Sequence, residues 1–336
     1  MLSDAVLDRI LTRLPNVRIG VLGDLFLDRY LDIDATLTEP SLETSLDAYQ
    51  VVRVRSYPGA AGTVINNLAA LGVGRIMPIA LIGDDGEGHE LRQELQKLKS
   101  VDAAHIMSWP GRRTPTYAKP MLQRPGEPAR ELNRLDIKNR TPTPAEGEDA
   151  VIGALDSAWR MADAWIVLDQ VSETDCGVVT ARVRDRVAEV GAADPGRFVL
   201  ADSREHIDQF RNVSLKPNER EGRDLFELQQ RCGRAIFWTR GEHGIWVFHP
   251  GVMQPTPVPG YPVTGPIDPV GAGDSVSAGI ASAVAAGTTL EVAAAFGNLV
   301  ASITIQQIGV TGTANPSQVR DRWREVRDLP IPPAYV

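Results

Sequence analysis

The stretch Asp268-Pro269-Val270-Gly271-Ala272-Gly273-Asp274 ends in a glycine turn that leads directly into an Ala-rich helical pattern. Small residues before a helix leave backbone N–H groups unpaired at its start, and an anionic oxygen can approach them closely. An aspartate beside such an anion site can accept the proton of a hydroxyl group as that hydroxyl attacks a phosphoryl group. The alternative interpretation is an ordinary glycine turn in which Asp274 caps the helix. The candidate catalytic residues are Gly271, Ala272, Gly273 and Asp274.

Other phosphate-binding motifs are absent from the sequence. No Gly-x-x-x-x-Gly-Lys-Ser/Thr run occurs in the chain, which excludes a Walker-type phosphate loop. The first apolar run, 17–22, ends at Gly23 and is followed by Asp24, with no Gly-x-Gly-x-x-Gly motif. A dinucleotide-binding site is therefore unsupported.

Short apolar runs alternate with helical patterns around this turn and along most of the chain. The runs 17–22, 76–82, 165–168, 198–201, 235–239 and 245–248 predict buried strands. The patterns at 63–71, 88–98, 146–161, 174–190 and 219–231 predict helices. The apolar stretch 278–305 is interrupted by polar residues and predicts paired core helices rather than a membrane span. Together these patterns predict an α/β fold with a mostly parallel central sheet and helices on both faces.

Two parts of the chain break this alternation with short extended segments. Residues 30–36 can pair with 49–56, and 117–123 can pair with 129–135 across a turn-forming sequence. These segments predict hairpin strands outside the main sheet, which are candidates for a lid contributed by about residues 29–57 and 115–136. Because exposed strand edges offer unpaired backbone groups, we expect a homodimer formed through the lid.

Composition and charge narrow the function classes. A chain of 336 residues with 43% hydrophobic content can bury a large core. A net charge of -8 and a pI of about 5.3 argue against nucleic-acid and membrane partners. Cys176 and Cys232 support neither a disulfide framework nor a zinc site. The first ten residues resemble an amphipathic helix rather than a signal peptide, so we expect a cytoplasmic protein.

The opening stretch resembles the Asp-Thr-x-Gly-Ala-Gly-Asp signature of the PfkB, or ribokinase-like, carbohydrate kinases. Further segments resemble the family's other motifs in the same order, namely Gly23–Tyr30, Pro58–Gly72, Gly83–Gly88, Lys216–Glu221 and Thr239–Gly244. The matches extend from about Arg18 to Gly312. Within the family, Gly23–Tyr30, Gln50–Arg55 and Asn133–Asp136 are most similar to the kinase half of bifunctional ADP-heptose synthesis proteins. The resemblance implies a single ribokinase-like kinase domain over residues 1–336.

The resemblance also implies an activity and a set of ligands. The expected reaction transfers the γ-phosphoryl group of ATP, with Mg²⁺, to a hydroxyl of a sugar or a sugar phosphate, for example one like a heptose phosphate. Asn218 and Glu221, at the start of a predicted helix, can face the same way and order Mg²⁺ through water. Asp268 matches the aspartate beside a monovalent cation site, which binds K⁺ in some members. The implied substrate-binding residues are Asp28, Gly59, Ala60, Thr63, Asn67, Lys119 and Asp169. The implied nucleotide-binding residues are Asn218, Thr239, Gly241, Gly244 and Asn298.

The substrate loop departs from the family pattern, which has a second glycine and a sugar-binding asparagine. Ala60 has less backbone freedom than glycine, and Thr63 offers one hydroxyl where an amide offers two donors and an acceptor. We therefore expect a different acceptor rather than lost chemistry. Two alternatives stay open, a nucleoside kinase of the same fold and a non-catalytic sensor of sugars or nucleotides. Lys119, Arg134 and Asp136 could also be ordinary surface charges on the lid.

Overall fold

A nine-stranded sheet forms the centre of the protein, and the computed structural model describes residues 2–252 and 254–329. The strands of this sheet are β1 (Arg18–Gly23), β6 (Arg75–Gly83), β7 (His105–Trp109), β11 (Ala164–Asp169), β12 (Phe198–Ser203), β13 (Ser214–Leu215), β14 (Ile236–Thr239), β15 (Ile245–Phe248) and β16 (Thr256–Val258). They lie in the order β16-β15-β14-β13-β12-β11-β1-β6-β7. Neighbouring strands are parallel except β14 with β15 and β15 with β16, so of these nine strands β15 runs opposite to the other eight. The predicted mostly parallel sheet is confirmed.

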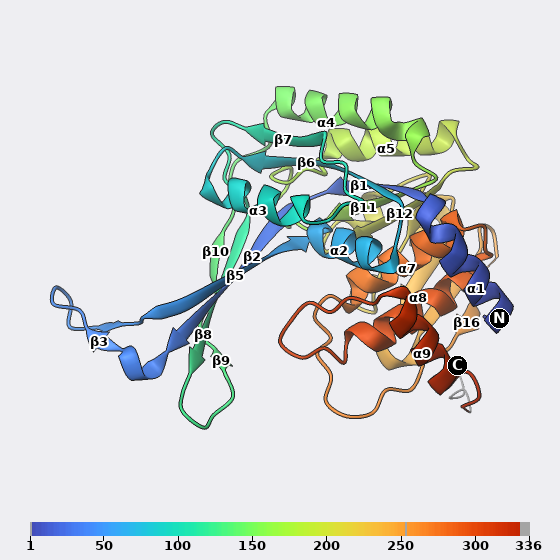
Figure 1. The fold of residues 1–336 in the computed structure, drawn as a ribbon. Coiled ribbons are helices and arrows are strands. Elements are labelled where there is room, and N and C mark those ends of the chain that lie inside the picture. Colours follow the sequence, from blue (N-terminus) through green and yellow to red (C-terminus); the bar gives the residue numbers. More distant parts are fainter. Residues whose placement is uncertain (1, 253, 330–336) are drawn as a thin grey trace.

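Helices cover both faces of this sheet (Figure 1). One face carries α4 (Ala145–Ala158), α5 (Ala181–Ala193) and α6 (Leu225–Cys232). The other carries α1 (Asp4–Arg13), α2 (Ala61–Leu71), α3 (Gly86–Gln96), α7 (Ala272–Ala285), α8 (Leu290–Thr304) and α9 (Pro316–Val326). Within the described residues, no helix combines the length and the apolar character needed to cross a membrane.

The central strands are apolar along most of their length, which allows both of their faces to be buried. In β11, Ile166 and Leu168 belong to the core under α7, while Trp165 and Val167 belong to the core under α4 and α5. Trp165 lies against β1 at Gly20, where a β-carbon would come within 2.3 Å of the indole ring. Glycine at position 20 is therefore required for these two strands to pack with the tryptophan between them.

A second sheet forms the lid and projects to one side of the body (Figure 1). Its strands are β2 (Leu25–Asp34), β5 (Val51–Ala60), β8 (Thr116–Gln123), β9 (Arg130–Glu131) and β10 (Leu135–Ile137), in the order β10-β8-β2-β5 with β9 beside β8. A small ribbon of β3 (Glu39–Pro40) and β4 (Asp47–Ala48) lies at its far end. The sequence predicted the antiparallel pairing of β2 with β5, but not the parallel pairing of β2 with β8.

Two helices begin later than their sequence patterns predicted. α5 begins after Thr180, whose side chain caps it, and the preceding loop is held by the carboxylate of Asp24 through the N–H groups of Gln170, Val171 and Val178. α6 begins after its N-cap residue, Asp224. The predicted starts at residues 174 and 219 were wrong because polar side chains bind the backbone there in turns.

The parallel strands all end at one edge of the main sheet, and polar residues gather there. Asp169 and Asp202 lie at the ends of β11 and β12, Lys216 follows β13, and Thr239 ends β14. In open α/β sheets this carboxyl edge is where ligands bind. The lid extends from the same edge, because β2 follows β1 after the single residue Asp24.

Candidate active site

The glycine turn forms the start of α7, as the sequence predicted. Gly271 is the N-cap residue with a φ of 79°, and a β-carbon there would lie 2.6 Å from Cγ2 of Thr311. Among the residues that the structure describes, no acceptor pairs with the N–H groups of Gly273 and Asp274. Asp274 lies in the first turn of the helix and does not cap it. The turn therefore offers an anion site with a carboxylate beside it.

Hydrogen bonds hold residues 268–272, which lead into the turn, in a fixed conformation. The N–H of Ala272 donates to the carbonyl oxygen of Pro269 over 3.1 Å, so this amide is already paired and the anion site consists of the next two amides. Asp268 accepts from the N–H groups of Val270 and Gly309, over 3.1 and 3.2 Å. Asp268 thus joins the turn to the loop after α8, and a monovalent cation beside it stays a prediction.

Asp274 is the most perturbed carboxylate of the site. Burial raises its pKa to about 7, and the negative charge of Asp202 acts in the same direction. The charges of Lys216 and Arg204 oppose this shift, and Asp28 adds a smaller upward contribution. A base whose pKa lies near neutrality is suited to accept a proton and release it again at physiological pH.

The pH dependence of activity should report this shift. Because a general base acts in its deprotonated form, we expect kcat/KM to be lost as the pH falls through about 7. Asp202→Asn removes a charge that raises the pKa of Asp274, so the acidic limb should move to lower pH. The measurement is a pH–rate profile of both proteins. Glu205→Gln, at an exposed carboxylate paired with Arg220, is the control and should leave the limb in place.

A buried ion pair lies beneath the turn, and sequence reasoning missed it. Nζ of Lys216 lies 2.9 Å from Oδ2 of Asp202, and the Lys216 side chain is 4% exposed. Ser277 of α7 donates to the same carboxylate oxygen over 3.3 Å. Burial alone would lower the pKa of Lys216, but the charges of Asp202, Glu221 and Asp274 raise it, so the amine stays protonated. Asp202 directly follows the predicted strand 198–201, but β13, which Lys216 follows, was not predicted from the sequence.

Asn218 and Glu221 face each other across a turn rather than along a helix, which corrects the predicted placement. The N–H and Nδ2 of Asn218 donate to the Glu221 carboxylate over 2.9 and 2.7 Å. Burial raises the pKa of Glu221, and the charge of Asp202 adds to this effect. The carboxylates of Asp202, Glu221 and Asp274 thus outnumber the buried cation Lys216. Mg²⁺ prefers oxygen ligands and keeps several waters, and its binding by Asn218 and Glu221 through water stays a prediction.

The predicted nucleotide-binding residues lie beside this turn. The N–H and Oγ1 of Thr239 donate to the carbonyl oxygen of Pro217, which ties the end of β14 to Asn218. Gly241 and Gly244 follow with φ values of 54° and 84°. Asn298 is buried on α8, where its Nδ2 donates to the carbonyl oxygens of Val258 and Pro259. Its amide therefore holds the loop after β16, and direct contact with a nucleotide stays a prediction.

The predicted substrate-binding residues Asp28 and Lys119 form an ion pair on the lid. Nζ of Lys119 lies 3.3 Å from Oδ2 of Asp28 and 3.1 Å from the hydroxyl of Tyr30. Burial alone would lower the pKa of Lys119, but Asp28 and Tyr30 raise it. A β-carbon on Gly59 would lie 2.9 Å from the Asp28 carboxylate, so this glycine gives the carboxylate room. Lys119 is thus a buried residue rather than an ordinary surface charge, and its contact with a substrate stays a prediction.

The substrate loop joins the acceptor side to the catalytic turn. Ala60 has a φ of 52°. Glycine adopts this conformation easily and alanine does not, so the backbone at Ala60 is strained. Thr63 is buried, and a β-carbon on Gly271 would lie 3.4 Å from its methyl group. Asn67 is fully buried and donates to the carbonyl oxygen of Thr63, while its Oδ1 has no partner among the described residues. Sugar contacts from Thr63 and Asn67 stay predictions.

Asp169 belongs to a separate buried cluster. Its Oδ2 accepts from the hydroxyl of Ser203 over 2.8 Å and lies 3.0 Å from Nδ1 of His206 and 3.7 Å from Arg184. The hydrogen bond to Asp169 raises the pKa of His206. These contacts hold the ends of β11 and β12 together, and a substrate contact from Asp169 stays a prediction.

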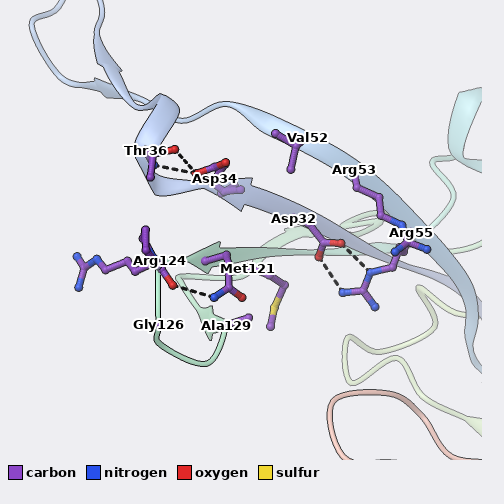
Figure 2. Close-up of a pocket in the computed structure, with 13 residues that line it drawn as sticks. Asp32, Asp34, Thr36, Val52, Arg53, Arg55, Met121, Arg124, Gly126 and Ala129 are labelled. Carbon is purple, nitrogen blue, oxygen red and sulfur yellow. Dashed lines mark hydrogen bonds and ion pairs between the residues drawn. The ribbon is translucent and has the colours of Figure 1, made fainter.

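The face of β2 that carries Asp28 and Tyr30 continues outward along the lid. Figure 2 shows Asp32 and Arg55 paired further along this face, with Nη2 of Arg55 2.8 Å from Oδ1 of Asp32. They border a hollow of about 850 Å³ that extends to Arg124 and Ala129. On β10 and the residues before it, Arg134 pairs with Asp136 over 2.6 Å. Most cations of this face are therefore already matched by carboxylates.

Comparisons with known proteins find similar chains. Residues 198–318 match the model of the pfkB family carbohydrate kinases. The chain is 29% identical over 335 residues to the bifunctional protein HldE of Pelobacter propionicus and 27% identical over 330 residues to that of Nitratiruptor. In both cases 93% of this chain is covered, and the chain spans 64% and 66% of the length of these relatives.

Solved structures share the fold at lower identity. A microbiome-derived acarbose kinase is 17% identical with a TM-score of 0.68, the match covering 92% of this chain and 99% of that one. Arabidopsis thaliana ribokinase complexed with ribose and ATP is 15% identical with a TM-score of 0.65, at coverages of 91% and 98%. The ribokinase-like fold, the Gly-Ala-Gly-Asp turn at the start of α7 and the match over residues 198–318 make this protein similar to the pfkB family carbohydrate kinases.

Proposed function

We propose that this protein is an ATP-dependent kinase that phosphorylates a hydroxyl group of a sugar or a sugar phosphate. The observation that supports this most strongly is the position of Asp274. Its carboxylate, with a pKa near 7, lies beside the free N–H groups at the start of α7. A base next to an anion site is what the transfer of a phosphoryl group to a hydroxyl requires.

In the proposed reaction, the acceptor hydroxyl lies between Asp274 and the lid residue Asp28. Asp274 accepts the hydroxyl proton as the acceptor oxygen forms a bond to the γ-phosphorus of ATP. The bond from that phosphorus to the bridging oxygen breaks, and ADP leaves with the electron pair. The N–H groups of Gly273 and Asp274 bind the oxygens of the transferred group. Such fixed donors need no reorganisation during the reaction, which lowers the barrier.

Asn218 and Glu221 would hold Mg²⁺ through water. The ion would then lie close to Asp202 and to Thr239 at the end of β14. A bound Mg²⁺ neutralises phosphate charge, which the carboxylates of the site would otherwise repel. The Asn218 hydrogen bonds fix both oxygens of Glu221 in one orientation. The lid would close over the acceptor and keep water from competing with it.

The test is a coupled ADP-release screen over sugars, sugar phosphates and nucleosides, with Mg²⁺ present. We expect turnover on a sugar or a sugar phosphate that exceeds background ATP hydrolysis. Turnover on nucleosides alone would make the protein a nucleoside kinase. ATP binding without turnover on any acceptor would instead indicate a sensor, and the proposed enzyme would be wrong.

We also propose a homodimer formed through the lid. β5 is an edge strand of the lid sheet, and its Val52 and Val54 are 58% and 53% exposed. Covering such a strand with a second copy would satisfy its backbone groups and bury its valines. In sedimentation we expect a dimer for the wild type and a monomer for Val54→Asp. Val252→Asp, at an exposed valine between β15 and β16 of the main sheet, should stay dimeric; a monomeric wild type would contradict the proposal.

A further inference from the structure

The face of the lid that carries Asp28 continues beyond the residues that the proposed reaction uses. Alternate residues of β2 share one face of the sheet, so Asp28, Tyr30 and Asp32 point the same way. Lys119 contacts both Asp28 and Tyr30. Arg55 lies 4.9 Å from the centre of the Tyr30 ring and pairs with Asp32. These contacts form a continuous polar surface that extends outward from Asp28.

This surface leads into the hollow of about 850 Å³ that Figure 2 shows around Asp32, Arg55 and Met121. A strand rises by about 3.3 Å per residue, which places Asp32 about 13 Å from Asp28. One sugar ring held beside Asp28 does not reach that far, whereas an acceptor of several linked rings does. A hollow of this volume lies in the range that small-molecule sites occupy. The size and the distance therefore fit an acceptor longer than a monosaccharide.

The charges in and beside the hollow balance each other. Asp32 pairs with Arg55, and Glu127 pairs with Arg124. The full set is three carboxylates and three guanidinium groups, those of Asp32, Asp34, Glu127, Arg53, Arg55 and Arg124. A phosphate dianion only accepts hydrogen bonds and is repelled by carboxylates, whereas a hydroxyl donates and accepts and can bind both members of an ion pair. The hollow thus favours an uncharged ligand rich in hydroxyl groups.

We propose that the acceptor is an uncharged oligosaccharide whose reacting ring lies between Asp28 and Asp274 and whose further rings lie along β2 in the hollow. This inference rests on the proposed kinase function and names the class of its acceptor. The hydroxyl groups of the distant rings bind the pair of Asp32 and Arg55. Met121 is the neighbour of Asp32 on β8 and offers an apolar surface to the C–H groups of a ring. The bonds that form and break are those of the proposed reaction.

The test compares sugars of increasing length by coupled ADP release with Mg·ATP. The probes are the monosaccharide, disaccharide and trisaccharide of the glucose, mannose and galactose series. In the best series we expect kcat/KM to be about tenfold higher for the trisaccharide than for the monosaccharide, the gain that one or two added hydrogen bonds give. The gain should be mostly in KM, because rings remote from the reacting hydroxyl are bound equally before and during the reaction. Maltose 6′-phosphate should be no better an acceptor than maltose.

A variant of the hollow links this gain to the proposed subsite. Met121→Trp fills part of the hollow, so the ratio of kcat/KM for the trisaccharide to that for the monosaccharide should fall to about one. Met161→Trp makes the same exchange at a methionine just after α4 that is 38% exposed, and should keep the wild-type ratio. A wild-type ratio of one, a Met121→Trp ratio equal to that of the wild type, or turnover on sugar phosphates alone would overturn the inference and leave the kinase function standing. Absence of turnover on every sugar and sugar phosphate would instead contradict the kinase function itself.

Discussion

Replacing Asp274 by asparagine is expected to lower kcat on the best acceptor by about three orders of magnitude, because the reaction loses its general base. Asparagine has the same shape and can still pack in the first turn of α7, but it does not take up the hydroxyl proton. ATP binding should change little, since the N–H groups of Gly273 and Asp274 are part of the backbone. The measurement is kcat from ADP release, beside the ATP dissociation constant from calorimetry.

The same substitution should not destabilise the fold. The pKa of Asp274 is raised in the folded protein from 3.8 to about 7, so the folded state holds a proton that the unfolded chain releases between these values. Stability therefore falls as the pH rises through this range, and a neutral asparagine avoids that loss. At pH 8 we expect a melting temperature equal to or above that of the wild type. A kcat above one tenth of the wild-type value would show that Asp274 is not the base.

A matched control tests whether the loss of another carboxylate near β12 also lowers kcat. Asp208→Asn removes an exposed carboxylate a few residues beyond the strand end. We expect its kcat to stay within about twofold of the wild type. Substitutions of exposed residues that make no buried contact usually have small effects. An equal loss in both variants would point to the overall charge of this edge rather than to proton transfer by Asp274.

Local signals in the sequence were enough to predict the glycine turn at the start of α7 and the main strands. Gly271 and Gly273 surround a small residue directly before a helical pattern, and the geometry of a helix start depends on a few neighbouring residues. The buried strands were equally clear, since β1 and β11 are apolar at nearly every position. These features are properties of short segments, which a sequence displays directly.

The pairing of Asp202 with Lys216 depends instead on which strands are neighbours. β12 and β13 lie side by side in the sheet, and only this arrangement brings the two side chains together. The same is true of Lys119 and Asp28, which meet because β8 pairs with β2 in parallel. Sequence motifs could propose Asp28 and Lys119 separately, but the ion pair itself required the sheet order.

Asn218 and Glu221 illustrate a competition between two local signals. The pattern at 219–231 predicted a helix, and within a helix residues three apart share a face. In the structure Oδ1 of Asn218 accepts from the N–H groups of Arg220 and Glu221, over 2.9 and 3.0 Å, and these bonds hold a turn. The two side chains still meet, so the expected neighbours were right although the element was wrong.

Replacing Gly271 by alanine is expected to lower kcat by between two and three orders of magnitude, as removal of oxyanion donors does in other enzymes. Two effects act together at this position. The φ of 79° strains any residue that has a β-carbon, and that carbon would lie 2.6 Å from Cγ2 of Thr311. The turn must shift to relieve the contact, and the N–H groups of Gly273 and Asp274 move with it. The measurement is kcat from ADP release.

Two further variants separate strain from contact. Gly265→Ala introduces alanine at a φ of 91° in the loop before the turn, where a β-carbon meets nothing within 4 Å, so kcat should stay near the wild-type value. Thr311→Ser removes the methyl group that the β-carbon of the introduced alanine would strike. Combined with Gly271→Ala it should restore much of kcat, because only the backbone strain, about 1 kcal/mol, is then left. If the double variant is as inactive as Gly271→Ala, the contact with Thr311 is not what displaces the anion site.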